Sequence, residues 1–259
     1  MSENRYEKME KGKKEARIGL DSEKDIINMI NISKEFQDSL RRCLITLGFN
    51  PEKKIIARKN NTKTDILIKI SDKEEIGVSI KSSTRTSFHQ IDRRRLEEWK
   101  AFLGIPNDIF EIMKEAILRV ARNSRDKFIL EEDRDKIREF FAKNLKKIIY
   151  EIFRKKEQNL KLLMINDKRK RRIYIFNMDD ALVFLFENAR NKIDFTKKGI
   201  IRLGDFITIQ RKGGNGKRVT IPKTDWMHPG NQLQFKFSPL RFAEYIEKTK
   251  AIRFCTINY

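Results

Sequence analysis

Cysteine and histidine are almost absent from this sequence, which contains only Cys43, Cys255, His89 and His228 of these two types. Two cysteines so far apart form neither a CxxC metal knuckle nor a disulfide framework, so we expect two reduced thiols in the core. Two histidines give no basis for a His-rich zinc site and disfavour a nuclease that depends on a His-containing metal finger.

Long apolar runs are also missing. The longest, such as ALVFLF at 181–186, are far shorter than the roughly 20 residues that a helix needs to cross a bilayer. The first twenty residues are charged throughout and lack the apolar stretch of a secretory signal. We therefore expect no membrane contact and a cytoplasmic location.

Acidic residues are scarce relative to basic ones, with 37 Asp and Glu against 58 Lys and Arg and a net charge of +21. Such an excess repels itself unless a polyanion or dissolved counterions compensate it, and nucleic acid is the obvious polyanion. A solvated lysine-rich surface that binds nothing is the alternative. Charge alone names no reaction.

Glycine and proline are few, with 11 and 5 residues, whereas 39% of the chain is hydrophobic, so the composition indicates a globular α/β protein. We expect one domain over 1–259, with N-terminal helices and a hairpin in 1–92, helices and a second hairpin in 93–195, and strands with a closing helix in 196–259. Apolar periodicity predicts its elements. Strands are expected at 53–59, 64–70, 76–83, 160–167, 171–177, 204–218 and 231–238, and helices before Gly48, within 93–157 with a break at 104–106, at 178–190 and at 240–249.

One pair of predicted strands carries a chemically suggestive pattern. Asp65 opens the first strand, and Ser79 and Lys81 share one face of the next, while Val78 and Ile80 face the core. A carboxylate can hold Mg²⁺ and a lysine can orient or deprotonate a water molecule, which is the pairing that phosphodiester hydrolysis needs. The pattern is short and also fits an ordinary amphipathic hairpin.

A second pattern extends over most of the chain and consists of several short sequence blocks. They are SEKDI at 22–26, QDSLRRCLITLGFN at 37–50, KTDI at 63–66, FHQID at 88–92, FITIQRKGG at 206–214 and LQFKF at 233–237. In these blocks the chain resembles the HinP/MspI-like type II restriction endonucleases of the PD-(D/E)xK superfamily. The resemblance implies a restriction-endonuclease-like fold with a mixed central sheet flanked by helices, and Mg²⁺-dependent cleavage of both strands of a short G/C-rich palindrome, with GCGC as the best candidate. It further implies double-stranded DNA as the substrate, a cognate DNA methyltransferase in the same cell, and a monomer or homodimer.

The resemblance also implies that Asp65 binds the metal and that Lys81 is the catalytic lysine. Ser79 falls where an acid is usual and where this group tolerates Gln or Asn instead. A hydroxyl contributes no charge, so another carboxylate is needed. Glu23, in the helix that carries SEKDI, is the first candidate for that metal ligand. Glu74 and Glu75 are nearer in sequence, but they lie in the hairpin turn, where residues are usually solvated.

The remaining blocks are expected to contact DNA. Phe88, in a polar loop, is either a wedge between base pairs or a core anchor for the next helix, and the resemblance favours Phe88 and Gln90 as DNA contacts. It makes two C-terminal runs the major-groove reader: Gln210, Arg211, Lys212, Gly213, Gly214 and Asn215 on one, and Gln232, Gln234 and Lys236 on the other. Arg211 and Lys212 suit guanine. The basic runs at 93–95 and 168–172 are expected to contact phosphates at most.

Two further readings stay open at this point. A DNA-binding protein that kept the fold but lost cleavage would explain Ser79 in place of an acid. A basic RNA-binding protein would prefer single strands and recognise no palindrome.

Overall fold

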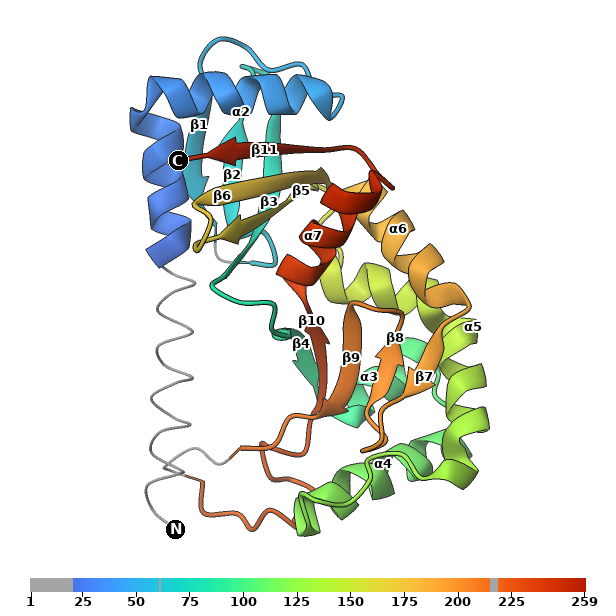
Figure 1. Cartoon of the computed structure of the whole chain (residues 1–259). Coiled ribbons are helices and arrows are strands. Elements are labelled where there is room, and N and C mark those ends of the chain that lie inside the picture. The colour runs from blue at the N-terminus through green and yellow to red at the C-terminus, as the bar shows by residue number, and fades with distance from the viewer. Residues whose placement is uncertain (1–20, 61, 215–218) are drawn as a thin grey trace. The chain divides into compact units, whose positions relative to one another are not determined.

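The computed structural model describes residues 21–60, 62–214 and 219–259, which form two compact units (Figure 1). Unit 1 is formed by the chain up to Ser87, by Lys156–Ala181 and by Pro239–Tyr259, and unit 2 by Phe88–Lys155 and Leu182–Ser238. The single domain expected over 1–259 stays a prediction.

Unit 1 is built on a six-stranded mixed sheet. Its strands, in spatial order, are β1 (Ile56–Lys59), β2 (Ile66–Lys69), β3 (Glu75–Ser83), β5 (Leu160–Asp167), β6 (Arg172–Asn177) and β11 (Phe254–Asn258). The β3–β5 pair is parallel and the other neighbours are antiparallel. The meander within 53–83 and the hairpin within 160–177 are therefore confirmed.

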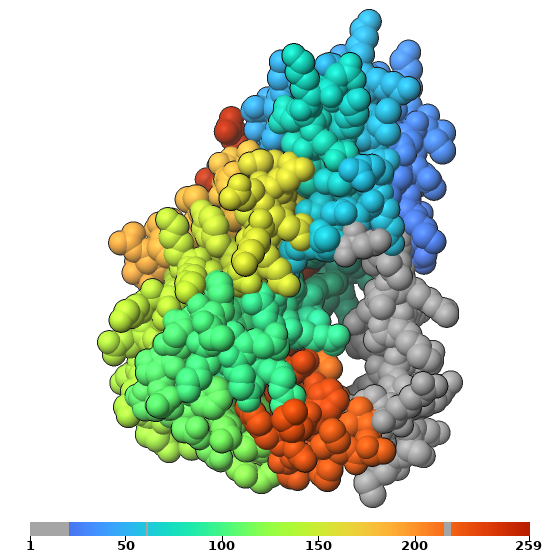
Figure 2. Space-filling model, turned by 180° about the vertical axis from the view of Figure 1, so that it is seen from behind, coloured from blue at the N-terminus to red at the C-terminus, as the bar shows by residue number. Residues whose placement is uncertain are grey.

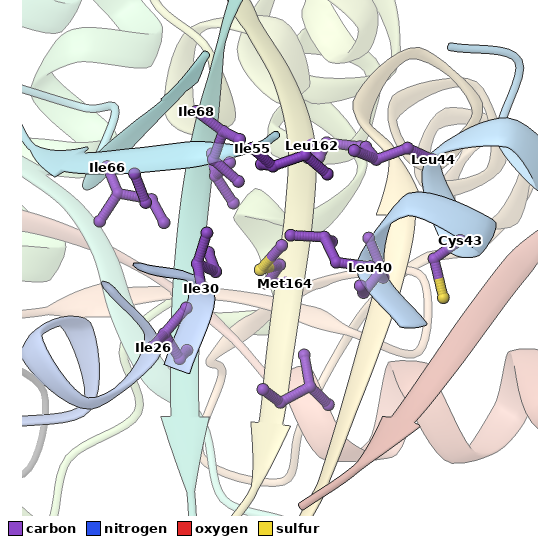
Figure 3. Packing of buried hydrophobic residues seen from close by; sticks show 14 of the residues in the cluster. Ile26, Ile30, Leu40, Cys43, Leu44, Ile55, Ile66, Ile68, Leu162 and Met164 are labelled. Atoms are coloured by element: carbon purple, nitrogen blue, oxygen red, sulfur yellow. The ribbon is translucent and has the colours of Figure 1, made fainter. Parts of the chain in front are cut away.

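One face of this sheet is covered by the helix over residues 21–32 and by α2 (Lys34–Thr46). Ser33 separates the two, and its hydroxyl caps α2 by accepting a hydrogen bond from Phe36 N. Figure 3 shows Ile30 and Leu40 of the helices pointing toward Met164 of the sheet. Because alternate residues of a strand point to opposite faces, every second residue of β3 and β5 contributes to this core.

The opposite face of the unit 1 sheet is covered by α7 (Pro239–Thr249), which contacts β3 and β5. The rings of Phe176 and Phe242 meet edge to face with centroids 5.1 Å apart. The carboxylate of Glu247 accepts hydrogen bonds from Tyr174 and Arg172 at 2.9 and 2.8 Å. This face thus combines apolar packing with a polar rim.

Cys43 and Cys255 form a disulfide, with Cα atoms 5.3 Å apart, so the prediction of two reduced thiols was wrong. Cys43 lies on the packed side of α2 (Figure 3), and Cys255 lies on β11. β11 is an edge strand that the sequence did not predict, and its pairing with β6 carries Cys255 to α2. A pairing between residues separated by 212 positions leaves no local signal.

Unit 2 contains a five-stranded antiparallel sheet. Its strands, in spatial order, are β4 (His89–Arg94), β10 (Leu233–Phe237), β9 (Ile207–Arg211), β8 (Ile201–Leu203) and β7 (Ile193–Phe195). The β9–β10 pair confirms the predicted C-terminal strand pair. The short strands β7 and β8 were not predicted.

The strand β4 corrects the expectation of a polar loop that leads into a helix at Arg93. Two of its charged residues are paired: Arg94 contacts Asp92 at 2.9 Å and Glu151 at 2.8 Å and lies over the ring of Trp99. Buried charges are tolerated when they are paired, and a strand that carries them lacks the apolar alternation by which strands are recognised.

The helical region of the chain follows the predicted outline. It comprises α3 (Leu96–Leu103), α4 (Asn107–Arg122), the short η1 (Glu131–Asp133) and α5 (Arg134–Phe153), and α6 (Met178–Arg190) follows β6. Gly104, with φ +68°, ends α3, and Pro106 caps α4, which confirms the break at 104–106. In the part of the chain that the structure describes, no helix combines the length and apolarity needed to cross a membrane.

Candidate active site and candidate nucleic-acid interface

Asp65, Ser79 and Lys81 lie together in unit 1, as the sequence pattern predicted. Asp65 directly precedes β2, and its Oδ2 accepts a hydrogen bond from Ile80 N at 2.6 Å and one from the Ser79 hydroxyl at 3.2 Å. Val78 and Ile80 are buried in the core, which leaves the alternate residues of β3 to face Asp65. The carboxylate is therefore held against β3 by two donors.

The ammonium of Lys81 is surrounded by three oxygen atoms. It donates to Ser79 Oγ at 2.8 Å and to the Ile80 carbonyl at 3.1 Å, and it lies 3.4 Å from Asp65 Oδ2. The Lys81 and Asp65 side chains are 22% and 20% exposed, so ligands can reach both. Carboxylate, hydroxyl and carbonyl oxygens are the donors that Mg²⁺ accepts, so the group of atoms around this ammonium suits a small hard cation.

Glu23, in the helix over 21–32, belongs to the same electrostatic environment. Burial raises the pKa of its carboxyl group, the charge of Asp65 raises it further, and the charges of Lys59 and Lys81 oppose both effects. Its Oε2 lies 3.6 Å from Lys59 Nζ, and its side chain is 17% exposed. Glu23 is thus a carboxylate that can join Asp65 as a metal ligand.

Glu74 and Glu75 fit that role less well. Glu75 is opposite Lys69 at the far end of β2 from Asp65, and its carboxylate makes two hydrogen bonds to Arg58, at 2.9 and 2.8 Å. Across the described residues no cluster of three or more Asp, Glu, His or Cys side chains is placed to hold a metal. A cation near Asp65 would therefore rely on two carboxylates and on uncharged oxygens.

Glu157 is a residue near this cluster that sequence reasoning missed. Its carboxylate accepts hydrogen bonds from Lys63 N at 2.6 Å, from Thr64 N at 2.7 Å and from the Thr64 hydroxyl. Burial raises the pKa of Glu157, but the hydrogen bonds from Thr64, Lys63 and Thr62 outweigh this and hold the pKa below its ordinary value. Glu157 lies in a charged segment more than 90 residues from Thr64, so no local signal marks it.

In unit 2, several residues predicted to contact DNA gather on one face of the sheet. Gln234 of β10 is opposite Gln210 of β9, and Lys236 is opposite Gln90 of β4. Gln234 Nε2 donates to Gln90 Oε1 at 2.6 Å. Gln90 is exposed, and Phe88 is half-buried just before β4. The strands β4, β10 and β9 (Figure 1) thus carry a row of amides and one lysine, in which Gln90 is exposed and Gln234 is buried.

Arg211 lies on the other face of β9, opposite buried Leu233. The residue is 9% exposed, its Nε donates to Asn231 Oδ1 at 2.7 Å, and burial lowers its pKa. Asn231 in turn donates to the carbonyls of Lys223 and Asp225. Arg211 therefore supports the segment that leads into β10, and Nη2 has no hydrogen-bond partner within the described chain.

The turn that follows β9 has an unusual backbone. Gly213 and Gly214 have φ values of +65° and +77°, a conformation that L side chains rarely adopt. Gly213 N donates to Gly230 O at 3.0 Å, and Lys212 N donates to the carbonyl of half-buried Gln232 at 2.9 Å. Burial and the charge of Arg93 lower the pKa of Lys212. Asn215, also predicted to contact DNA, lies outside the described residues.

The polar insertion between β9 and β10 is anchored to the start of α3. Arg95 donates to the carbonyls of Trp226 at 3.0 Å and Met227 at 3.3 Å, and the Trp226 indole donates to Glu97. In Figure 2 the orange-red atoms of this insertion lie beside green atoms of the chain near residue 100. The insertion is thus part of the packed surface of unit 2.

Comparison with known proteins agrees with this architecture. No protein-family model matches the sequence, and no curated protein matches it. Among solved structures the chain is similar to the restriction endonuclease MspI, crystallised with its cognate DNA, with a TM-score of 0.56 and 16% identity over 88% of this chain and 92% of that chain. The chain has a restriction-endonuclease-like fold. This confirms the fold that the sequence blocks predicted.

Proposed function

We propose that the protein is a type II restriction endonuclease that hydrolyses both strands of a short palindromic DNA site in the presence of Mg²⁺. The observation that carries the proposal is the cluster of Asp65, Ser79 and Lys81 beside Glu23, in a chain with a restriction-endonuclease-like fold. The net charge of +21 suits a polyanionic substrate, and the structural neighbour MspI was solved with its cognate DNA.

The oxygen donors around Lys81 fit Mg²⁺. Asp65, Glu23, the Ser79 hydroxyl and the Ile80 carbonyl would hold the ion, because hard oxygen ligands are those it prefers. When bound, the ion would supply positive charge that polarises the scissile phosphate and acidifies water. The two carboxylates face two ammonium groups, those of Lys81 and Lys59, so their formal charges balance before a cation binds.

Lys81 is the residue that we assign to proton transfer and charge stabilisation. Its three N–H groups are directed at Ser79, Ile80 and Asp65, so it would hold a water molecule near that carboxylate by exchanging one of these contacts when the cation binds the oxygens. A fixed ammonium also stabilises the negative charge that develops on the phosphate. Before a cation binds, Ser79 accepts from Lys81 and donates to Asp65, which keeps the two side chains together.

Unit 2 is the part of the chain that we assign to sequence recognition. Gln90, Gln210, Gln234 and Lys236 form a row of donors and acceptors suited to base edges in a groove. Arg211 and Lys212 are proposed as contacts to guanine, so the proposed site is G/C-rich, with GCGC as the best candidate. For Arg211, which is 9% exposed, this requires its side chain to leave Asn231 when DNA binds. Phe88 is proposed as a wedge at a base step.

Cleavage of plasmid DNA tests the proposal. The purified protein with Mg²⁺ is expected to yield discrete fragments, and sequencing of the fragment ends gives the site and the cut position. Lys81→Ala is expected to abolish the fragments. Lys69→Ala, which removes a lysine of the neighbouring strand that pairs with Asp72 at 2.8 Å, should leave them unchanged.

Ser79 in place of an acid favours one alternative, a DNA-binding protein with an inactive nuclease fold. Tight, sequence-specific binding without cutting in Mg²⁺ or Mn²⁺ would establish that alternative. Preference for single-stranded RNA would contradict both readings.

An active restriction endonuclease also endangers the DNA of its own cell. We therefore propose a cognate methyltransferase that protects the same palindrome, and cytoplasmic action as a monomer or homodimer. Cleavage rates of methylated and unmethylated duplexes test the protection by methylation. The mass of the protein–DNA complex distinguishes a monomer from a homodimer.

A further inference from the structure

The turn before Asp65 is tied to a distant part of unit 1. Both oxygens of the Glu157 carboxylate accept backbone hydrogen bonds from the turn, one from Lys63 N at 2.6 Å and the other from Thr64 N at 2.7 Å, and the Thr64 hydroxyl donates as well. Thr64 is 3% exposed and Glu157 is half-buried, so these bonds are partly shielded from water.

A glycine makes this contact possible. β2 and β5 flank β3 on its two sides, and the segments that precede β2 and β5 meet over Gly77. A Cβ on Gly77 would lie 2.9 Å from both Thr64 Cγ2 and Oγ1 and 3.0 Å from the Asn159 carbonyl, which accepts from Gly77 N at 2.7 Å. A larger residue at this position would therefore force the Thr64 side chain or its surroundings to shift.

The consequence falls on the next residue, Asp65. Its own N–H donates to Val78 O at 2.9 Å, so the backbone is fixed on both sides of the carboxylate, by Glu157 through Thr64 and by β3. A carboxylate that serves as a metal ligand must be held within about 0.5 Å of its working position. The bonds of Glu157 go to residues 63 and 64, so its effect on the Asp65 carboxylate is indirect.

We propose that Glu157 is a positioning residue, which fixes residues 63–64 and thereby aims the Asp65 carboxylate at its cation. The proposal rests on the proposed function for the identity of the reaction, but the contact network that supports it is independent of cleavage. Groups that orient a metal ligand typically account for about 10- to 100-fold in metal affinity or activity.

Glu157→Gln tests this role. The amide keeps the shape of the side chain, but one oxygen becomes an NH₂ group that cannot accept the bond from Thr64 N or Lys63 N. We expect a kcat at least about tenfold lower, an unchanged KM for DNA, and an about tenfold higher half-saturating Mg²⁺ concentration. Thr64→Ser, which keeps the hydroxyl, should behave as the unaltered protein, whereas Thr64→Val, which removes the hydroxyl donor but keeps both backbone bonds, should show a smaller effect in the same direction as Glu157→Gln.

Glu247→Gln is the matched control. Glu247 is a half-buried carboxylate of the same unit that accepts hydrogen bonds from Arg172 and Tyr174 on β6. This variant is expected to lower the melting temperature and to leave kcat and Mg²⁺ dependence unchanged, because its bonds fix no part of the turn.

Two measurements that do not depend on DNA cleavage separate this inference from the proposed function. Mg²⁺ titration by calorimetry and amide hydrogen exchange at residues 63–65 are compared in the two Glu→Gln variants. Weaker Mg²⁺ binding and faster exchange in Glu157→Gln alone support the positioning role, even if the unaltered protein cuts no DNA. Unchanged exchange or unchanged Mg²⁺ binding overturns it. If Glu157→Gln does not fold, the comparison of Thr64→Val with Thr64→Ser decides: faster exchange and weaker Mg²⁺ binding in Thr64→Val alone support the role, and no difference between the two overturns it.

Discussion

The Ser79 hydroxyl lies 2.8 Å from the ammonium of Lys81 and 3.2 Å from the carboxylate of Asp65, so one neutral group bridges the two charged ones. Ser79 is 4% exposed, and an acid there would bury a third negative charge beside Asp65 and Glu23. The site therefore keeps the geometry of a carboxylate–lysine pair with a hydrogen-bonding residue in place of the usual acid.

Ser79→Ala tests whether the orientation of Lys81 contributes to cleavage, because it removes a hydrogen bond to Lys81 and changes no charge. Lys81 would keep the Ile80 carbonyl and Asp65 as partners but lose its shortest hydrogen bond. We expect single-turnover cleavage about tenfold slower with unchanged DNA affinity, the loss that corresponds to about 1.4 kcal/mol of transition-state stabilisation. Cleavage at the original rate would show that the bridge has no role in the reaction.

Glu23→Gln and Glu75→Gln distinguish the two candidates for the second metal-binding carboxylate. Glu23 feels the charges of Asp65 and Lys81, whereas Glu75 is paired with Arg58 at the other end of β2. Removing the charge of Glu23 is expected to weaken Mg²⁺ binding at least about tenfold in calorimetric titrations, and Glu75→Gln should have no effect. A loss of Mg²⁺ affinity in Glu75→Gln and not in Glu23→Gln would assign the second metal ligand to Glu75.

Arg211→Ala is expected to cost roughly 1–3 kcal/mol of binding free energy on the preferred palindrome and little on random DNA. Lys170→Ala, in the basic run at 168–172, should weaken binding to all sequences. It should also reduce the slope of the logarithm of the binding constant against the logarithm of the salt concentration by about one. Fluorescence anisotropy at several salt concentrations measures both. Because Arg211 also supports Asn231, the melting temperature of the variant must be recorded, and equal losses on both DNAs would remove Arg211 from the recognition surface.

The stability of unit 2 should fall in mild acid because of His228. Its side chain is buried, and Nδ1 accepts from Gly230 N at 2.9 Å. Burial lowers the pKa of His228, and the charges of Arg211, Lys223 and Lys212 lower it further, against the charge of Asp225. The unfolded chain therefore binds this proton more readily, so stability is full above pH about 6.5 and decreases as the pH falls toward the folded-state pKa.

Urea unfolding at pH 7.5 and pH 5.5 measures this effect. We expect a loss of stability between the two pH values that is smaller in His228→Gln than in the unaltered protein. An identical loss in both proteins would assign the acid sensitivity to other groups.

The disulfide should stabilise unit 1 by about 2–4 kcal/mol, since it links positions 212 residues apart and restricts the unfolded chain. Reduction with dithiothreitol is expected to lower the urea midpoint of the unaltered protein to that of the Cys43→Ser, Cys255→Ser double variant. The double variant itself should not respond to the reductant. A midpoint that is the same with and without reductant in the unaltered protein would contradict the link.

Local features of the chain could be predicted from the sequence. The meander that carries Asp65, Ser79 and Lys81 is encoded by apolar alternation and by turn residues, so its strands and its shared face followed directly. The strand β4 was missed because its charges are paired through contacts with other elements. The contact of Glu157 with Thr64 and the Cys43–Cys255 disulfide were not predicted for a related reason. In each case the two residues are distant in sequence, and only the fold brings them together.

The most direct test of this account is digestion of a plasmid of known sequence in Mg²⁺, with every fragment end sequenced. All ends are expected to map to one short palindrome, cut in both strands, and Lys81→Ala is expected to produce none of them. Ends scattered over the plasmid, or unchanged cutting by Lys81→Ala, would contradict it.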